Sequence, residues 1–447
     1  MIGKIGVGSK QVVFDDSALS EHKAYNTIRL RPLLLTKPTG FTLSRPISIY
    51  DEGNGNYKIS HTVDDLFPRL SGVTYYVDPV NGLDTNDGLT WQTAFKKISK
   101  ADGMADVAIV MLKSGIYGSV LHSWTTLRDK DIKYISEANQ PPAIIFPGWP
   151  ASYKTWTDMT GYFQASTFGT VNNVFDTTQK QAEMNYELTK LTLVASEAEV
   201  PLLANSYYVD TENSLININV GRMPDANVLC CTSLGILTVS QTSFTGERHV
   251  CFENINFIFR LAFVIDSPNK LNIYGKNLRI GFSTNTDGLG ITGNVFSYME
   301  NCISQNNYND GFNYHGVGDY NPEFIEVNCI GRSNGYGNNT GINNGSTCHE
   351  SGKGIRLNGI YHNNEGRNVH DINISQTWNV NCYAFNSVAT TGDAAKEDFA
   401  VWDTAKMWNY KCTAYGASVI NAEAQATAHM YNKVCDFDRA SGLMETY

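Results

Sequence analysis

The feature that most constrains this chain is an internal repeat in its C-terminal half. Seven segments from residue 250 onward share one position, which is Asn six times and Lys once. This Asn column consists of Asn254, Asn277, Asn301, Asn328, Asn358, Asn381 and Lys411, spaced by 23, 24, 27, 30, 23 and 30 residues. A second, apolar column runs through Leu289, Phe312, Ile342, Ile372 and Phe399. Such spacing with irregular insertions is typical of a parallel β-helix, in which each rung is three short strands and inserted residues form outside loops.

The residues after each member of the Asn column alternate in a way that predicts which side chains face the interior. The inward positions are Ile255, Leu278, Cys302, Cys329, Gly359, Cys382 and Cys412, followed two residues later by Phe257, Ile280, Ser304, Gly331, Tyr361, Ala384 and Ala414. The outward positions are Asn256, Arg279, Ile303, Ile330, Ile360, Tyr383 and Thr413. Four of the nine cysteines therefore share one interior stack, and we interpret them as reduced packing residues.

Composition narrows the classes of function. The net charge of -10 and the absence of a basic run argue against a nucleic-acid partner, because phosphate binding needs clustered Lys and Arg. The first residues, "MIGKIGVGSKQVVFDDS", lack the charged head and apolar core of a secretory signal. No stretch approaches 18 consecutive apolar residues. We therefore expect a soluble chain that is made without Sec export and does not insert into a membrane.

The N-terminal half predicts how the first rung is covered. A strand is expected from Thr74 to Asp78, a helix from about Trp91 to Lys100, and a strand from Val107 to Leu112. The helix is inferred from Trp91, Ala94, Phe95 and Ile98, which fit one apolar helical face. A short amphipathic helix at this place would cover the exposed edge of the first rung.

Two segments carry a resemblance to a known family. They are "YYVDPVNGLDTNDGLTWQTAFKKISKA" followed by "LKSGIY", and "SYYVDTENSLININVGRMPDANVL". With the repeat they resemble right-handed parallel β-helix proteins of the pectate-lyase-like superfamily, especially bacteriophage tailspike depolymerases, over roughly residues 72 to 420. The second segment resembles a hairpin that these proteins insert before the regular rungs. The superfamily contains lyases, hydrolases, esterases and non-catalytic members, so the resemblance is specific for fold and weak for chemistry.

The resemblance implies an all-β, right-handed parallel β-helix divided into four parts. Residues 1–70 form a small N-terminal module, 71–250 the first part of the β-helix with its capping helix and inserted hairpin, 251–420 the regular rungs, and 421–447 the end of the helix. It also implies a homotrimer on a virion tail, acting outside the cell on a bacterial capsular or O-antigen polysaccharide. In a tailspike the N-terminal module attaches to the phage tail or baseplate. The outward stripe of Ile303, Ile330 and Ile360 is the predicted contact between chains.

Candidate catalytic residues gather where the insertions are longest. Alignment on the apolar column places Asp287, Asp310, Thr340, His370 and Glu397 in one further column, so Asp287 and Asp310 should lie on neighbouring rungs. Two such carboxylates can divide the acid and base or nucleophile roles of glycoside hydrolysis. The competing interpretation is that each Asp bonds to its own backbone in an Asp-Gly turn.

The second chemistry left open is β-elimination from a uronic acid, which needs a base and a positive group. His315, His349 and His370 are candidate catalytic residues, with Glu350 orienting His349. The candidate substrate-binding residues are Lys353, Arg356, His362, Arg367, Tyr314 and Trp378. The spacing of the histidines matches no zinc motif, and the turn that holds Asp78, Asp84 and Asp87 needs no ion, so we expect neither metal nor cofactor. The alternatives to a phage depolymerase are a non-catalytic glycan-binding spike and a bacterial polysaccharide lyase.

Overall fold

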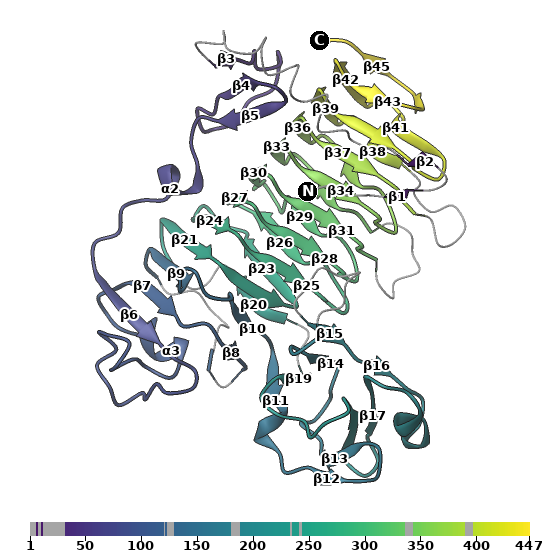
Figure 1. Cartoon of the computed structure of the whole chain (residues 1–447). Coiled ribbons are helices and arrows are strands. Elements are labelled where there is room, and N and C mark those ends of the chain that lie inside the picture. The colour runs from purple at the N-terminus through teal and green to yellow at the C-terminus, as the bar shows by residue number, and fades with distance from the viewer. Residues whose placement is uncertain are drawn as a thin grey trace, which may run out of the picture. The chain divides into compact units, whose positions relative to one another are not determined.

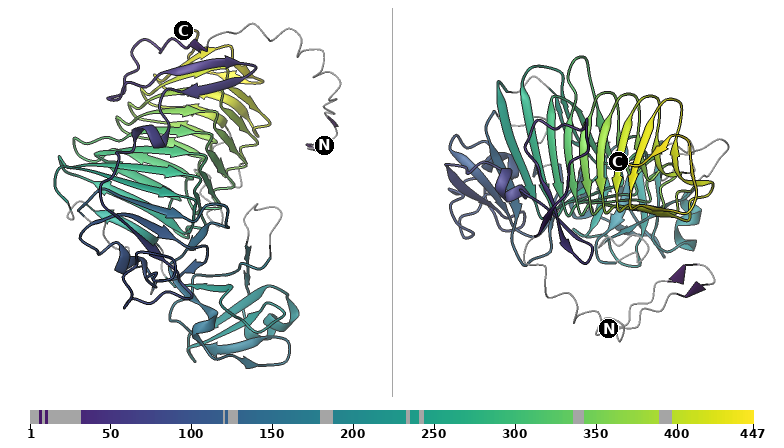
Figure 2. Two further views of the ribbon diagram at one scale, coloured as in Figure 1. Left: turned by 60° about the vertical axis from the view of Figure 1, so that its left-hand side comes forward. Right: turned by 90° about the horizontal axis from the view of Figure 1, so that it is seen from above.

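The computed structural model describes residues 32–119, 121–122, 129–179, 188–232, 244–335, 343–388 and 397–447, with the backbone of strands β1 (Gly6–Val7), β2 (Lys10–Gln11) and β20 (Gly235–Ser240). The chain forms three long sheets of parallel strands, in which the strands of successive rungs lie side by side (Figures 1 and 2). The predicted right-handed parallel β-helix is confirmed. Among the described residues, no helix has the length and apolar character needed to cross a membrane.

Each regular rung contributes one strand to each sheet, which we call sheets I, II and III. Sheet I contains β6 (Val73–Val77), β7 (Val107–Leu112), β9 (Ile132–Ser136), β21 (Glu247–Glu253), β24 (Lys270–Lys276), β27 (Val295–Glu300), β30 (Glu323–Val327), β33 (Lys353–Leu357), β36 (Gln376–Val380), β39 (Lys406–Tyr410), β42 (His429–Lys433) and β45 (Met444–Glu445). Sheet II contains β8 (Ile116–Tyr117), β10 (Ala143–Ile145), β22 (Ile255–Ile258), β25 (Arg279–Gly281), β28 (Ile303–Gln305), β31 (Ile330–Arg332), β34 (Ile360–His362), β37 (Tyr383–Phe385), β40 (Thr413–Tyr415) and β43 (Asp436–Phe437). Sheet III contains β20, β23 (Arg260–Ile265), β26 (Leu289–Gly293), β29 (Phe312–His315), β32 (Ser346–Cys348), β35 (Val369–Asp371), β38 (Glu397–Val401), β41 (Ile420–Ala424) and β44 (Ala440–Ser441).

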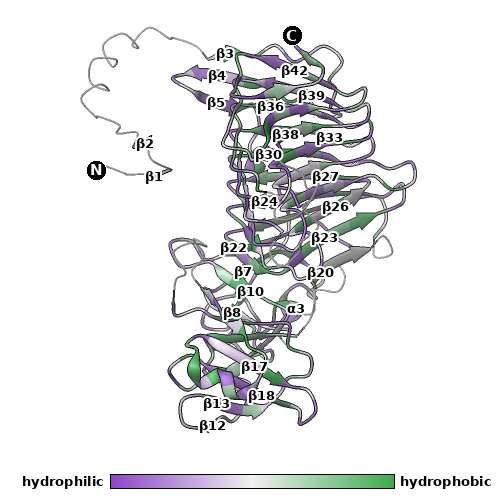
Figure 3. Cartoon of the chain, turned by 90° about the vertical axis from the view of Figure 1, so that its right-hand side faces the viewer, coloured by the Kyte–Doolittle hydropathy of each residue, from purple (hydrophilic) through white to green (hydrophobic). Residues whose placement is uncertain are grey.

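The Asn column forms the turn that leads from sheet I into sheet II. Its seven members all have positive φ, between 51° and 56°, a conformation that Asn tolerates better than most residues. The Asn side-chain amides bond to one another along the axis: the amide of Asn328 donates to Asn301 at 2.9 Å and accepts from Asn358 at 3.1 Å. The registers also confirm the predicted inward and outward positions of sheet II. The cysteines are free thiols. Both hydrophobic and hydrophilic residues occur along the strands of the β-helix (Figure 3).

We predict that Asn328→Ala lowers the free energy of unfolding by about 1–3 kcal/mol, because Ala disfavours positive φ and cannot continue the ladder. Asn328→Gly should cost less, since Gly adopts positive φ freely. Thermal unfolding of the two variants beside the wild type measures the difference. Equal midpoints for the Ala variant and the wild type would mean that the column contributes nothing to stability.

The first rung differs from the prediction in two respects. The strand predicted from Thr74 to Asp78 is β6 (Val73–Val77), one residue earlier, and the predicted helix is much shorter. Strand β7 has the predicted bounds, but the helix predicted from Trp91 to Lys100 is only α3 (Ile98–Ala101). The reason is that Phe95 makes a backbone bridge to Val77: its N–H donates to Tyr76 and its carbonyl accepts from Asp78. A side chain that was expected on a helical face is thus part of a parallel pairing, and it is buried there.

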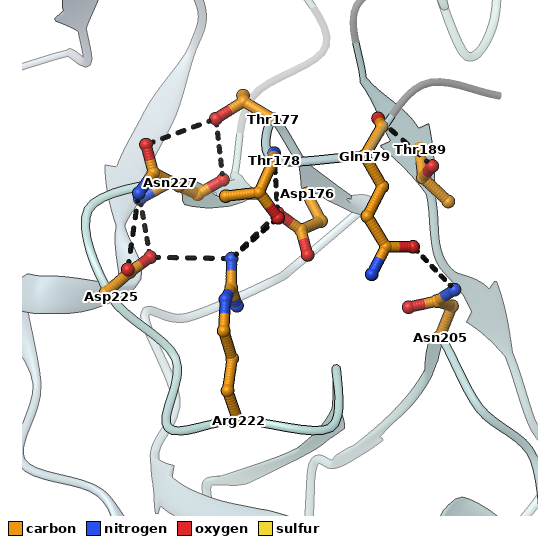
Figure 4. A network of polar contacts seen from close by, with 9 residues as sticks. All are labelled: Asp176, Thr177, Thr178, Gln179, Thr189, Asn205, Arg222, Asp225 and Asn227. Atoms are coloured by element: carbon orange, nitrogen blue, oxygen red, sulfur yellow. Dashed lines mark hydrogen bonds and ion pairs between the residues drawn. The ribbon is translucent and has the colours of Figure 1, made fainter.

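A large insertion separates β10 from the regular rungs. It contains β11 (Gly148–Pro150), β12 (Thr157–Asp158), β13 (Phe163–Ser166), β14 (Asn173–Asp176), β15 (Thr189–Lys190), β16 (Thr192–Leu193), β17 (Ser206–Asp210), β18 (Leu215–Asn219) and β19 (Val228–Cys231), with 3-10 helices η1 (Ala151–Tyr153) and η2 (Glu197–Leu202). The predicted hairpin is β17 paired with β18. A polar network fixes one end of the insertion: Arg222 pairs with buried Asp176 at 2.9 Å and with Asp225 at 3.7 Å (Figure 4).

The N-terminal residues divide between two compact units. One unit comprises Met1–Lys37 and Ile47–Ser60. Its described sheets are β1 paired with β2, and β3 (Leu33–Leu34), β4 (Ile49–Gly53) and β5 (Asn56–Ile59). The other comprises Pro38–Pro46 and His61–Tyr447. The module predicted over residues 1–70 therefore includes two segments that belong to the β-helix unit.

Those two segments cover part of the outward face of sheet I. The ring of Phe41 lies 6.2 Å from that of Trp378 and 5.9 Å from that of Trp408. Helix α2 (Val63–Leu66) contacts β24 and β27, and the ring of Phe67 packs on Tyr274 at 5.4 Å. This part of sheet I is therefore already occupied by the chain's own residues.

Candidate active site

The outward face of sheet III carries three columns of side chains, which together we call the sheet III face. The first, just before the strands, is Asp287, Asp310, Asn344, Arg367 and Glu397; the second is Gly290, Asn313, Thr347, His370, Ala400 and Glu423; the third includes Thr292, His315, His349 and Trp402. A Cβ built on Gly288 or Gly311 would meet interior atoms, so the preceding Asp287 and Asp310 point outward. Eight of these side chains are titratable: Asp287, Asp310, Arg367, Glu397, His370, Glu423, His315 and His349.

Asp287 and Asp310 lie on successive rungs, as predicted, and cap the next rung rather than their own turn. Oδ1 of Asp287 accepts the Asp310 backbone N–H at 3.4 Å, and Oδ1 of Asp310 accepts the Asn344 N–H at 2.6 Å. The two residues are 7% and 5% exposed. Burial and the neighbouring Asp287 carboxylate raise the pKa of Asp310 to about 8, so this carboxyl keeps its proton at neutral pH.

Arg367 belongs to the first column and contacts Glu397 in that column and Trp402 in the third. Its Nε lies 3.0 Å from Oε2 of Glu397, and its guanidinium carbon lies 3.8 Å from the ring centre of Trp402, a cation–π distance. The ring of His370 meets that of Trp402 edge-on at 5.0 Å. Burial, with the charge of Arg367, holds the pKa of His370 well below its usual value, so its imidazole is neutral. No hydrogen bond to its buried Nε2 is found among the described residues.

The alignment that placed His370 in the column of Asp287 and Asp310 was wrong. In the structure Ser346 and Val369, rather than Ile342 and Ile372, continue the column of Leu289 and Phe312. Arg367 therefore occupies the position expected for His370, and His370 lies in the adjacent column. Thr340 and Ile342 fall outside the described residues.

His315, His349 and Glu350 meet at the far end of the strands. The two imidazole rings stack with centres 3.8 Å apart and an interplanar angle of 18°. The partner of Glu350 is His315, with Nδ1 to Oε2 at 3.3 Å, whereas the sequence predicted an interaction with His349. Six predicted site residues thus lie on the sheet III face or its edge: Asp287, Asp310, His315, His349, Arg367 and His370, with Glu350 beside them.

The other five candidate substrate-binding residues lie away from the sheet III face. Burial corrects the prediction for Arg356, Tyr314 and Trp378, whereas for Lys353 and His362 it stays a prediction. Arg356 and Tyr314 are fully buried inside the β-helix, where Arg356 pairs with Asp371 and Tyr314 stacks on Phe324. Lys353 and Trp378 lie on sheet I, where Lys353 bonds to Thr42 and Phe41 covers Trp378. His362 is on sheet II, stacked on Phe385 at 4.6 Å. None of these five side chains faces the same way as the Asp pair.

Sequence reasoning missed several members of the face, and one of them is a cation. A Cβ built on Gly290 would lie 3.1 Å from a guanidinium nitrogen of Arg260, so Arg260 reaches over the neighbouring rung. Trp402 was missed because it follows β38, beyond the aligned motif. A signal was available for Gly290: a glycine within a strand often marks a close approach by another group.

The turn that holds Asp78, Asp84 and Asp87 is held by the protein's own groups. Asp78 accepts from the backbone N–H groups of Val80 and Asn81 and from Nζ of Lys113. Asp84 accepts from two backbone N–H groups, and Asp87 from that of Leu89. These bonds account for the three carboxylates as turn residues.

No family model matches the chain, and no curated protein matches it. Similar solved structures include one named glycoside hydrolase, at TM-score 0.47 and 8% identity, covering 83% of this chain and 96% of that chain. Others are pectate lyase Pel9A, at TM-score 0.41, 12% identity and coverages of 83% and 79%, and the tailspike protein gp49 from Pseudomonas phage LKA1, at TM-score 0.23, 10% identity and coverages of 75% and 68%. At these scores the similarities carry no argument about substrate or reaction, and the fold assignment rests on the three parallel sheets.

Proposed function

We propose that the chain is a glycan-degrading enzyme that hydrolyses glycosidic bonds on the sheet III face, with Asp310 as general acid and Asp287 as its partner carboxylate. The observation that carries this proposal is the pair of outward carboxylates on successive rungs, one of which keeps its proton at neutral pH. Glycoside hydrolysis requires two carboxyl groups in different protonation states on either side of the scissile bond.

The division of roles follows from the environments of the two residues. Asp310, protonated by burial and by its neighbour, donates its proton to the glycosidic oxygen as the bond to the leaving sugar breaks. As that bond breaks, the anomeric carbon forms its new bond on the opposite face, either to a water whose proton Asp287 takes as base or to Asp287 itself as nucleophile; in the second case water then releases the sugar from Asp287. Inversion of the product anomer would assign the base role, and retention the nucleophile role.

The rest of the face supplies contacts for a chain of sugars. Arg260 and Arg367 can donate to hydroxyl or carboxylate oxygens, and the Trp402 ring adds apolar surface beside them. Because the columns continue over several rungs, successive sugar units can bind along the axis of the β-helix. Asp287 and Asp310 lie at one end of the first column, so cleavage should occur toward one end of such a bound segment.

The test is incubation of the protein with purified bacterial capsular and O-antigen polysaccharides. Chromatography follows polymer length, and ultraviolet absorbance follows unsaturated uronate ends. Shortening without new absorbance supports hydrolysis. Binding of a polymer without any shortening would contradict an enzymatic role and favour a glycan-binding spike.

A second candidate reaction is β-elimination, which the environment of His370 favours. Its imidazole is neutral, its Nε2 is without a hydrogen-bond partner among the described residues, and Arg367 lies close enough to lower its pKa. A neutral His can take the C5 proton of a uronate while an Arg binds the sugar carboxylate. Shortening that produces the absorbance of an unsaturated product would support this reaction and overturn hydrolysis.

The pH dependence provides a separate prediction for hydrolysis. An acid with a raised pKa is active while protonated, so kcat/KM should fall about tenfold per pH unit above about 8, where Asp310 loses its proton. A profile of kcat/KM against pH on a neutral polysaccharide measures this alkaline fall, because such a substrate has no ionisable group of its own. A rate that stays level to about two units above that value would exclude Asp310 as the acid.

We further propose that the natural setting is a phage tailspike trimer that binds a bacterial surface polysaccharide outside the cell. The support is the family resemblance and the outward stripe of Ile303, Ile330 and Ile360 on sheet II. The N-terminal module would attach such a spike to the tail or baseplate. A bacterial polysaccharide lyase outside any phage is the alternative setting.

For the trimer we predict that the full chain elutes with three times the protomer mass in light scattering and that Ile330→Asp gives the protomer mass. The reason is that a carboxylate in the middle of an apolar contact would be desolvated on assembly. A wild-type chain at 49.5 kDa would contradict this assembly. Thr413→Asp, at a partly exposed polar position of the same outward column beyond the Ile stripe, is the control, and it should leave the mass unchanged.

A further inference from the structure

Three potential metal ligands converge at the edge of the sheet III face. His315, His349 and Glu350 each present one ligand atom, and these atoms lie within 4.8 Å of one another. Nδ1 of His315 and Oε2 of Glu350 are 3.3 Å apart. Two ligands of a tetrahedral zinc ion, each bonded at about 2.0–2.1 Å, are separated by about 3.3 Å. One edge of the required tetrahedron is therefore present already.

Glu350 occupies an unusual place for a glutamate. It begins a column of turn residues that continues through Asn373 and Asp403, all with positive φ: 47°, 62° and 60°. In this column the Asn373 side chain accepts the Glu350 N–H at 2.9 Å, and the Asp403 side chain accepts the Asn373 N–H at 3.1 Å. The longer Glu350 side chain instead turns back to accept the Gly316 N–H at 2.7 Å and to meet His315. The next residue of the column, Ala426, also has positive φ, 57°, so the backbone position does not single out Glu350. What singles it out is its side chain, which contacts Gly316 and His315.

His349 has a nitrogen available for a ligand. Its Nε2 is buried, and no hydrogen bond to it is found among the described residues. A ring nitrogen without a hydrogen-bond partner can bind a metal ion in the neutral form of the imidazole. The imidazoles of His315 and His349 are stacked at 18°, so their in-plane lone pairs do not point at one centre, and His315 has to turn to bind the same ion as His349. The side chains of His315 and Glu350 are 38% and 45% exposed, so both have room to turn on the solvent side.

We propose that His315, His349 and Glu350 form a binding site for a divalent transition metal of the zinc class. Two imidazoles and one carboxylate are a ligand set that zinc accepts, and three protein ligands leave a fourth position for water or for a sugar oxygen. Calcium and magnesium, which prefer six or more oxygen ligands, fit this set poorly. The Gly316 N–H on the Glu350 carboxylate supplies the outer contact that orients a metal ligand. The site needs no assumption about the reaction at the Asp pair.

The experiment is titration of the full-length, chelator-treated protein with Zn²⁺ by calorimetry and with Co²⁺ by visible absorption. We expect one equivalent of each ion to bind, with the intense absorption of tetrahedral Co²⁺. His349→Ala and Glu350→Gln should each weaken binding at least tenfold, since even loss of an outer contact costs about 10–100-fold. Glu350→Gln changes a half-exposed group, so it keeps the test valid if His349→Ala folds poorly.

The matched control is His429→Ala. His429 and Glu445 form another His–carboxylate pair, at 2.6 Å, but no third ligand joins them among the described residues. This variant should bind as the wild type does. The proposal is overturned if the wild type binds neither ion, if Ca²⁺ binds in place of Zn²⁺, or if His349→Ala and Glu350→Gln bind as tightly as the wild type. Asp310→Asn, which should lower the rate of hydrolysis by about 10²–10⁴-fold, should still bind one equivalent, so failure of the metal site and failure of the proposed reaction are distinguishable.

Discussion

Asp310→Asn should lower kcat/KM for polysaccharide cleavage by about 10²–10⁴-fold, the range that general acid catalysis contributes. The amide cannot give a proton to the glycosidic oxygen. Its carbonyl oxygen can still accept the Asn344 N–H that Asp310 accepts at 2.6 Å, so the capping bond between the rungs is retained. The rate of formation of new reducing ends, on a polymer that the wild type shortens, measures the effect.

The control for this variant is Asp403→Asn. Asp403 also accepts the backbone N–H of a neighbouring rung, that of Asn373 at 3.1 Å, but it belongs to the turn column after sheet III. Asp403→Asn should keep the wild-type rate, and both variants should unfold near the wild-type temperature. If Asp310→Asn retains a tenth of the rate or more, or if both variants lose activity alike, Asp310 is a capping residue and not the acid.

Arg356→Met should lower the free energy of unfolding by about 3–5 kcal/mol, the cost of breaking a buried ion pair by removing one partner. The guanidinium donates to Asp371 at 3.0 Å and 3.3 Å and to Ser346 at 2.8 Å, and Arg356, Asp371 and Glu326 are all fully buried. Without Arg356, two carboxyl groups would remain in the interior with no positive charge beside them. Urea and thermal unfolding of the full chain measure the loss.

Two further variants make this prediction specific. Arg332→Met removes a half-buried Arg on sheet II that donates to Gln305 at 2.8 Å, and it should change stability by less than about 1 kcal/mol. Adding Asp371→Leu to Arg356→Met should recover part of the loss, because an apolar pair can replace a buried ion pair at little cost. Wild-type stability of Arg356→Met would show that the interior tolerates the unpaired carboxylates, for instance by protonating them.

The buried pair of Arg356 and Asp371 explains why the column alignment on sheet III was wrong. Inward positions were assigned by apolar character, and this succeeded on sheet II, where Phe257, Ile280 and Ala384 face the interior. On sheet III the inward residues of β32 and β35 include Ser346 and Asp371. A buried charge breaks the apolar pattern, so the alignment moved to Ile372, and His370 was assigned to the wrong column. No local signal in the sequence shows that Arg356, fifteen residues before Asp371, supplies the compensating charge.

The candidate site was predicted where neighbouring rungs repeat the same short motif. Asp287 and Asp310 stand in "TDGLG" and "NDGFN", and the structure places them on adjacent rungs. Glu350 and His315 come from different rungs without a shared motif, and their contact depends on the stacking of β29 and β32. Lys353 and Trp378 are close in sequence to the histidines, but a strand of the next sheet carries them to another side of the β-helix.

The sequence alone determined the fold, the turn formed by the Asn column and the adjacency of the two Asp residues. It could do so because each rung pairs with its neighbours in register, so that a repeat along the chain becomes a column in space. The tertiary structure decided which of three outward faces each polar residue joined, which of them lay beneath residues 38–46, and which entered the interior. These outcomes depend on which sheet each strand joins and on contacts between distant residues, such as Phe41 with Trp378 and Arg356 with Asp371. Neither leaves a local pattern in the sequence.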